Sequence, residues 1–179
     1  MPGFAIRIGT VDDAAALSEI GAETFWTTYR DSPKVENNDL KSYINRVYDE
    51  EIIRTELQDE GFRYLVAEDG TELAGYARLV IGSYIENIEA DRPLEISRIY
   101  LLDRFQGGGR GKQLIERCLE EADRFLCDKV WLSVWKHNKK AIGFYEKVGF
   151  EKVGTTSFDM AGTEHEDWVM EKDVVISES

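Results

Sequence analysis

The segment that most constrains this chain is Gln106-Gly-Gly-Gly-Arg-Gly111, which lies between two apolar stretches of different periodicity. Residues 94–102 alternate as in a well-covered strand, and the apolar positions from Leu114 onward recur at helical spacing. Glycine loses the most conformational freedom on folding, so four glycines at one strand–helix junction need a backbone reason. Glycines let the backbone approach a ligand closely, and the amides at a helix N-terminus attract anions. The segment therefore predicts an anion-binding loop.

Two common phosphate-binding loops do not fit this segment. A Walker loop, G-x-x-x-x-G-K-[ST], would need its first glycine at Gln106 and a hydroxyl residue after Lys112, where a glutamine stands. The dinucleotide pattern G-x-G-x-x-G, begun at Gly107, would place its third glycine at Lys112. The pattern that does fit is Q/R-x-x-G-x-G/A, with Gln106, Gly109 and Gly111 in its defining positions.

A second motif follows one expected helix and one expected strand later, Asn138-Lys-Lys-Ala-Ile-Gly-Phe-Tyr-Glu-Lys-Val-Gly-Phe150. The glycine segment resembles the pyrophosphate loop of the GNAT family of N-acetyltransferases, and the second motif resembles that family's N-x-x-A-x-x-F/L-Y-x-x-x-G-F. The likeness runs from about residue 62 to residue 173. It implies an α/β fold of the GNAT type: a mixed central β-sheet with antiparallel N-terminal strands, helices on both faces and a V-shaped splay between the two middle strands.

The periodicity of the remaining chain agrees with an α/β fold. We expect strands at 4–8, 62–68, 73–84 and 129–135, and closing strands at 150–159 and 167–170 with His165 in the turn between them. We expect a helix from the Thr10–Asp13 capping box to about Tyr29, two short helices between Val35 and Leu57, an amphipathic helix whose apolar set ends at Leu126, and a short helix stopped by Gly149. No repeat or linker interrupts the sequence, so residues 1–179 are predicted to form a single domain.

The family resemblance implies that acetyl-CoA is the cofactor and assigns residues to it. The amides from Gln106 to Lys112 would hold the pyrophosphate, and the main chain of residues 99–101 would pair with the pantetheine arm like an added strand. Asn138 would bind the arm or cap the helix that it opens, and both roles stay open. The positions assigned to the cofactor are Ile99, Tyr100, Leu101, Gln106, Gly107, Gly108, Gly109, Arg110, Gly111, Lys112, Asn138 and Tyr145.

The catalytic candidates are Tyr145 and Glu95. In the family, the tyrosine at the position of Tyr145 donates a proton to the departing sulfur, and its reference pKa near 10 is close to the value of about 8.5 for a thiol. An alkylamine with a pKa near 10.4 is neutral in only about one part in a few thousand at pH 7, so it must lose a proton before it attacks. Glu95, at the start of the cofactor-facing strand, is a candidate base and equally a candidate substrate-anchoring carboxylate. His137 is expected to be a solvent-facing loop residue.

A closer resemblance points to the acceptor. The segments 94–101, 130–138 and 157–164 look like bacterial spermidine/spermine N-acetyltransferases of the PaiA type, and Glu23-Thr-Phe-Trp-Thr-Thr-Tyr29 fits that subgroup too. The resemblance implies a small amine acceptor, first of all a polyamine, attacked directly in a ternary complex. Trp26 and Tyr29 would form the acceptor wall together with Glu95. The alternatives are acetylation of a protein or peptide amine, or an acyl-CoA sensor without turnover, which would not need Tyr145.

Charge and cysteine content restrict the partners further. Lys and Arg total 22 against 35 Asp and Glu, a formal net charge of −13, which argues against nucleic-acid and anionic-membrane partners and is compatible with a polycationic substrate. The sequence has no signal-peptide pattern, and Cys118 and Cys127 lie in or beside a helical pattern with no ligand in metal spacing. We therefore expect no metal site and a cytoplasmic location. A homodimer is compatible with the sequence.

Overall fold

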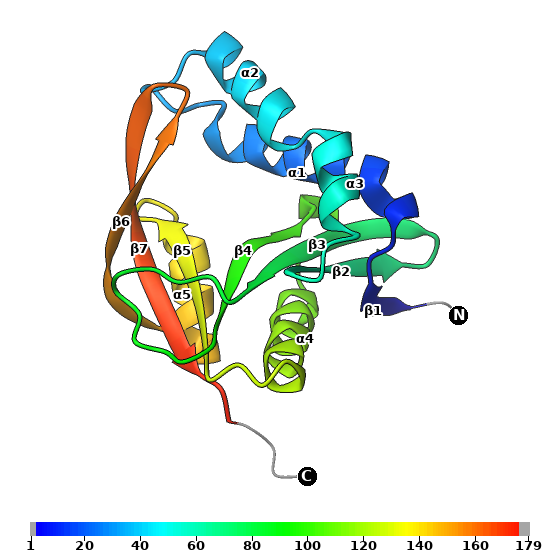
Figure 1. Cartoon of the computed structure of the whole chain (residues 1–179). Coiled ribbons are helices and arrows are strands. Elements are labelled where there is room, and N and C mark those ends of the chain that lie inside the picture. The colour runs from blue at the N-terminus through cyan, green and yellow to red at the C-terminus, as the bar shows by residue number, and fades with distance from the viewer. Residues whose placement is uncertain (1–2, 176–179) are drawn as a thin grey trace.

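A computed structural model describes residues 3–175 of the chain, and its centre is a single seven-stranded sheet (Figure 1). The strand order is β1-β2-β3-β4-β5-β7-β6. Only β4 and β5 pair in parallel, and all the other neighbours are antiparallel. The strands are β1 Phe4–Ile8, β2 Phe62–Asp69, β3 Glu72–Ile81, β4 Pro93–Leu101, β5 Lys129–Trp135, β6 Glu151–Met160 and β7 Thr163–Asp173.

Helices cover both faces of this sheet (Figure 1). They are the 3-10 turn η1 Val11–Asp13, α1 Ala14–Tyr29, α2 Asn37–Val47, α3 Glu50–Glu56, the 3-10 turn η2 Asp103–Phe105, α4 Arg110–Arg124 and α5 Lys139–Val148. Helices α4 and α5 share one apolar core with the sheet, while α1 and α3 pack into a second core on β2 and β3. The mixed sheet and the two helical layers confirm the predicted α/β architecture.

Helix α4 follows the predicted amphipathic pattern but ends earlier than expected. Its apolar stripe, which includes Leu114, Cys118 and Ala122, is fully buried. Arg124 is its last residue, and Leu126 lies beyond it with a φ of +57° and 66% of its surface exposed. The prediction that Leu126 belongs to the apolar face was wrong, because the chain leaves the helix before that position comes round to the core.

The two middle strands separate after three paired positions. Pro93 to Glu95 of β4 pair with Lys129 to Trp131 of β5, whereas beyond them β4 continues on β3 alone and β5 on β7 alone. β4 has a bulge close to this separation. Arg78 of β3 pairs with Arg98 and Leu79 pairs with Ile96, so Ser97 has no partner residue on β3. Unpaired edges of β4 and β5 therefore face each other across a V, as the family resemblance implied.

The closing hairpin differs from the prediction at its tip. The turn lies at Ala161–Gly162, and β7 already begins at Thr163. The prediction that His165 lies in the turn was therefore wrong. His165 is a buried strand residue stacked on Phe158 of β6. Residues 164–167 are all polar, yet they alternate as a strand does: Glu164 and Glu166 are exposed, whereas His165 and Asp167 are buried.

Candidate active site

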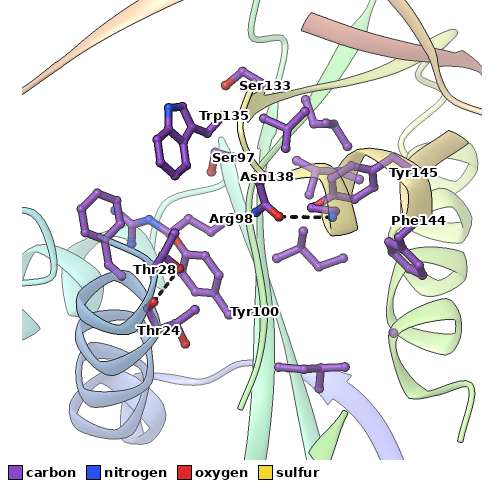
Figure 2. Close-up of a pocket in the computed structure, with 18 of the residues that line it drawn as sticks. Thr24, Thr28, Ser97, Arg98, Tyr100, Ser133, Trp135, Asn138, Phe144 and Tyr145 are labelled. Atoms are coloured by element: carbon purple, nitrogen blue, oxygen red, sulfur yellow. Dashed lines mark hydrogen bonds between the residues drawn. The ribbon is translucent and has the colours of Figure 1, made fainter. Parts of the chain in front are cut away.

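One cavity of about 1230 Å³ opens where β4 and β5 separate. Its walls come mainly from β4 at 96–101, β5 at 131–135, most of the loop and helix start at 106–112, and α1 at 23–25 and 27–29. Figure 2 shows Asn138, Phe144 and Tyr145 on one side of β4 and Thr24 and Thr28 on the other. Ligand pockets typically measure about 300–1,000 Å³, so this cavity has room for a long cofactor arm and a small acceptor together.

The glycine loop forms one end of the cavity and has the geometry of an anion cradle. Gly107, Gly108 and Gly109 have φ values of +94°, +64° and +78°, which side-chain-bearing residues rarely adopt. A Cβ placed on any of the three would meet no atom within 4 Å, so the space beside the backbone is open. The first amides of α4 have no partner within the helix. The residues present therefore fit a phosphate group, although Gly108 itself does not line the cavity.

The side chains of Gln106, Arg110 and Lys112 make different contacts around the loop. Gln106 Nε2 donates to the Leu101 carbonyl at 3.0 Å, which fastens the loop to the end of β4. Arg110 donates to Asp69 Oδ2 at 2.8 Å and is thereby occupied in holding the loop to β2. Lys112 is 69% exposed and pairs with Glu116 at 3.8 Å. Lys112 is thus the loop cation that can reach an incoming anion.

The second motif places Asn138 and Tyr145 on one helix. Asn138 Oδ1 accepts a hydrogen bond from the Ala141 amide at 3.2 Å, so this side chain caps α5. Tyr145, two turns further on, is 8% exposed and lines the cavity. Burial raises the pKa of the Tyr145 phenol well above its ordinary value, which keeps its proton on the oxygen at neutral pH. Its ring is held by Phe144 and Phe150.

The structure separates Glu95 and Trp26 from this cavity. Glu95 lies at the last paired position before the strands diverge, and its Oε2 accepts a hydrogen bond from Ser83 Oγ at 2.7 Å. Trp26 faces α2, where the Lys41 ammonium lies 5.4 Å from the centre of its ring. Neither residue lines the cavity, whereas Tyr29, the third residue predicted on the acceptor side, does.

Sequence reasoning missed the Arg98 side chain, which lines the cavity from β4 on the α1 side. Its guanidinium carbon lies 4.6 Å from the centre of the Tyr48 ring, and Nη2 donates to the Val47 carbonyl at 3.5 Å. The Tyr48 and Tyr100 hydroxyls share a hydrogen bond of 2.6 Å beside it. Within residues 3–175, no carboxylate forms an ion pair with Arg98. Arg98 thus brings a positive charge to this side of the cavity, which Glu23 of α1 also lines.

Asp167 of β7 was also missed, and it is the buried carboxylate of the cavity. It is paired in register with Trp135 of β5 and with Thr156 of β6, it is 7% exposed, and its Oδ1 has no hydrogen-bond partner. Burial raises the pKa of Asp167 to about 6, although the neighbouring Ser133 hydroxyl acts in the opposite direction. The strand alternation that buries Asp167 together with Val169 is the signal that could have found it.

Two further expectations concern metals and membranes. In the part of the chain that the structure describes, no three His, Cys, Asp or Glu side chains come together as a metal site. Among the same residues, 3–175, none of the helices has the length and apolarity needed to cross a bilayer. Cys118 and Cys127 are both buried free thiols, and burial raises the pKa of each.

Comparison with known proteins places this geometry in a family. Residues 22–150 match the acetyltransferase (GNAT) family. An uncharacterized N-acetyltransferase from the pepI 3′ region of Lactobacillus delbrueckii subsp. lactis is 32% identical over 98% of this chain and 100% of its own length. The chain belongs to the GNAT family, and it is an acetyl-CoA-dependent N-acetyltransferase. The predictions of family, enzyme class and cofactor are thereby confirmed.

Two further similarities concern the subgroup. The crystal structure of a PaiA N-acetyltransferase from Thermoplasma acidophilum, in complex with coenzyme A, covers 96% of this chain and 99% of its own, with a TM-score of 0.75 and 23% identity. A spermine/spermidine N(1)-acetyltransferase of Bacillus subtilis is 25% identical over 49% of this chain and 59% of its own length. The first of these matches shows that the two proteins share a fold.

Proposed function

We propose that this enzyme transfers the acetyl group of acetyl-CoA to a primary amine of a small molecule, with spermidine and spermine as the first acceptors to consider. The observation that carries this proposal is the continuity of the cavity, which runs from the glycine loop to a wall of aromatic rings with one buried carboxylate. Both substrates can therefore be bound at once, and the amine can attack the acetyl group directly in a ternary complex.

The cofactor end would be held mainly by backbone. Acetyl-CoA supplies an activated thioester carbonyl. The amides of the glycine loop and the Lys112 ammonium would hold its diphosphate, while Gln106 and Arg110 keep the loop in place. The free edge of β4 at residues 99–101 would form main-chain hydrogen bonds with the pantetheine arm. Asn138 would act through its cap on α5, which positions Tyr145.

Tyr145 would donate its proton to the departing sulfur. It is protonated at neutral pH, because the pKa of a free phenol is already near 10 and burial raises the pKa of Tyr145 further, and it lines the cavity beside the V. A sensor that binds acyl-CoA without turnover would gain nothing from a phenol at this place. The position of Tyr145 therefore favours an enzyme over a sensor.

The choice of a polyamine rests on three supports of unequal strength. The similarity to a spermine/spermidine acetyltransferase covers only half of the chain. The formal net charge of −13 attracts cations to the protein as a whole. Within the cavity, Arg98 disfavours a cation on the α1 side, and Asp167 favours one on the β7 side.

A panel of amines tests the proposal. Acetyl-CoA is incubated with spermidine, spermine, lysine peptides and aminoglycosides, and the released thiol is measured. We expect turnover with a polyamine. Turnover with a lysine peptide alone would replace the acceptor by a protein or peptide amine. Coenzyme A binding with no turnover on any amine would favour the sensor and reject the proposal.

Several predictions on partners and location are retained as part of the proposal. They are a single domain over residues 1–179, a cytoplasmic location, and no nucleic-acid or membrane partner. A homodimer is compatible with them, and light scattering of the purified chain decides between one and two copies.

A further inference from the structure

The end of the cavity beyond β5 is lined by aromatic rings from three different elements. Tyr29 of α1, Trp135 of β5 and Phe158 of β6 all line it. The Tyr29 ring centre lies 5.2 Å from that of Trp135 and 6.4 Å from that of Phe158. These three side chains, called the aromatic wall below, are far apart in sequence and close in space. Asp167 of β7 lines the same end.

The charge of Asp167 is not compensated by its surroundings. The groups facing it are the Tyr29 phenol from α1, Ser133 and Trp135 from β5, Thr156 from β6 and the buried His165 two residues along β7. Lys and Arg are absent from this set, and His165 Nδ1 lies 3.2 Å from the Thr163 carbonyl. The negative charge of Asp167 contributes to the raised pKa of the Tyr29 phenol. A buried carboxylate in such surroundings is costly unless a cation arrives to pair with it.

The cation that fits is an alkylammonium. Ring faces attract organic cations, and they also pack against the methylene groups that such a cation carries. A metal ion would need further ligands, and within residues 3–175 no three His, Cys, Asp or Glu side chains come together as such a group. The amine that the enzyme acetylates is an ammonium in water, because its pKa of about 10.4 lies well above neutral pH.

We propose that Asp167 and the aromatic wall form the ammonium subsite of the acceptor, and that Asp167 accepts the proton that this ammonium must lose before it attacks. This inference rests on the proposed acetyl transfer. It replaces Glu95, which is bonded to Ser83 outside the cavity, as the acceptor's carboxylate partner.

The protons balance as follows. The attacking nitrogen loses two protons in all. Asp167 Oδ1 takes the first, leaving a neutral amine, and passes it to water at the cavity mouth. As the new C–N bond forms and the C–S bond breaks, Tyr145 gives its proton to the sulfur, and the second proton from nitrogen, carried by water, restores the phenol. One proton thus ends on the thiol and one in solvent. The apolar wall favours the neutral acid and amine over two separated charges.

A binding experiment tests the subsite without turnover. Spermidine is titrated calorimetrically into wild-type protein, into Asp167→Asn, and into Asp173→Asn, a matched control on the same strand whose side chain is 85% exposed. We expect the dissociation constant to rise about tenfold or more for Asp167→Asn and to stay unchanged for Asp173→Asn. Equal affinity of wild type and Asp167→Asn overturns the subsite, and so does a wild-type protein that binds no spermidine.

A kinetic experiment tests the proton transfer with the amine that turns over best. We expect kcat/KM of wild type to fall as the pH drops through about 6, because the Asp167 carboxylate becomes protonated. Asp167→Asn should lose this acid limb and about a hundredfold or more in kcat/KM, while binding coenzyme A normally.

Asp167→Ser serves as a second variant if the amide disturbs folding. A large loss in Glu95→Gln with little in Asp167→Asn overturns the assignment but leaves the acetyl transfer standing, whereas wild type inactive on every amine rejects the proposed function itself.

Discussion

The two ends of the cavity are built by different means. The cofactor end is made of backbone, with three consecutive glycines of positive φ and the first amides of α4. The acceptor end is made of side chains, with three rings, one carboxylate and one guanidinium brought from α1, β4, β5, β6 and β7. A backbone cradle binds any ligand with the same anion, while a side-chain wall is specific and changes with each substitution. The difference predicts that variants at the two ends affect different kinetic constants.

The largest expected effect lies where the two ends meet, at Tyr145. Tyr145→Phe removes only the hydroxyl, so the ring still packs between Phe144 and Phe150. We expect kcat to fall roughly 10²–10⁴-fold while the affinities for coenzyme A and amine change little. Stopped-flow turnover and calorimetry on the same preparation provide both numbers. Near wild-type turnover would remove Tyr145 from its role as proton donor.

The sequence predicted the backbone end much better than the side-chain end. The glycine loop and the capped helix at Asn138 depend on local patterns and lie where such patterns place them, and the parted strands lie where the family resemblance implied. Tyr29, Trp135 and Asp167 come from segments that only the finished sheet brings together, so no local pattern marks them as a group. Their proximity is a product of topology.

The position of Glu95 shows how a bulge changes which side chains of a strand share a face. From sequence alone, a carboxylate at the start of the cofactor-facing strand looked well placed. The strands part only after Glu95, and the bulge at Ser97 shifts the alternation of β4, so that Arg98 comes to lie on the same face as Glu95 and Tyr100. Arg98 lines the cavity, whereas Glu95 is not among the residues that line it. A bulge of one residue changes which side chains face the substrate.

The next effect is on stability and concerns the acceptor end. Burial raises the pKa of Asp167 from 3.8 to about 6, so the folded state holds this proton more tightly than the unfolded chain does. The folded protein therefore loses stability as the pH rises from about 4 through 6. Asp167→Asn should be more stable than wild type at pH 8 by about 1–3 kcal/mol and no more stable near pH 4. Urea unfolding at both pH values measures the difference, and a gain of equal size at both would contradict it.

Spermidine sharpens this prediction. A cation bound at Asp167 offsets the unfavourable free energy of burying the carboxylate charge. Saturating spermidine should therefore stabilise wild type at pH 8 and reduce the difference in stability between wild type and Asp167→Asn. Thermal melts with and without the polyamine show this directly. A gap that stays constant would place the polyamine elsewhere.

At the cofactor end, Gly109→Ala has a matched control in Gly162→Ala. Gly109 has a φ of +78° and Gly162 of +84°, and a Cβ meets no atom within 4 Å at either site. Both substitutions should therefore destabilise the fold by about 1–2 kcal/mol. Only Gly109→Ala should also raise the KM for acetyl-CoA, by about tenfold, because only it lies at the start of α4. Equal KM values for the two variants would mean that the glycine loop does not hold the cofactor.

The smallest effect is expected at Lys112, because its side chain is 69% exposed and water screens its charge. Lys112→Gln should weaken coenzyme A binding about two- to fivefold at low salt, and this difference should shrink as ionic strength rises. Lys34→Gln changes the net charge equally from an exposed loop between α1 and α2, and it should leave the affinity unchanged. If both variants weakened binding alike, the general field of the protein would be responsible. If Lys112→Gln alone does so, one exposed lysine supplements a cradle whose binding comes mainly from backbone amides.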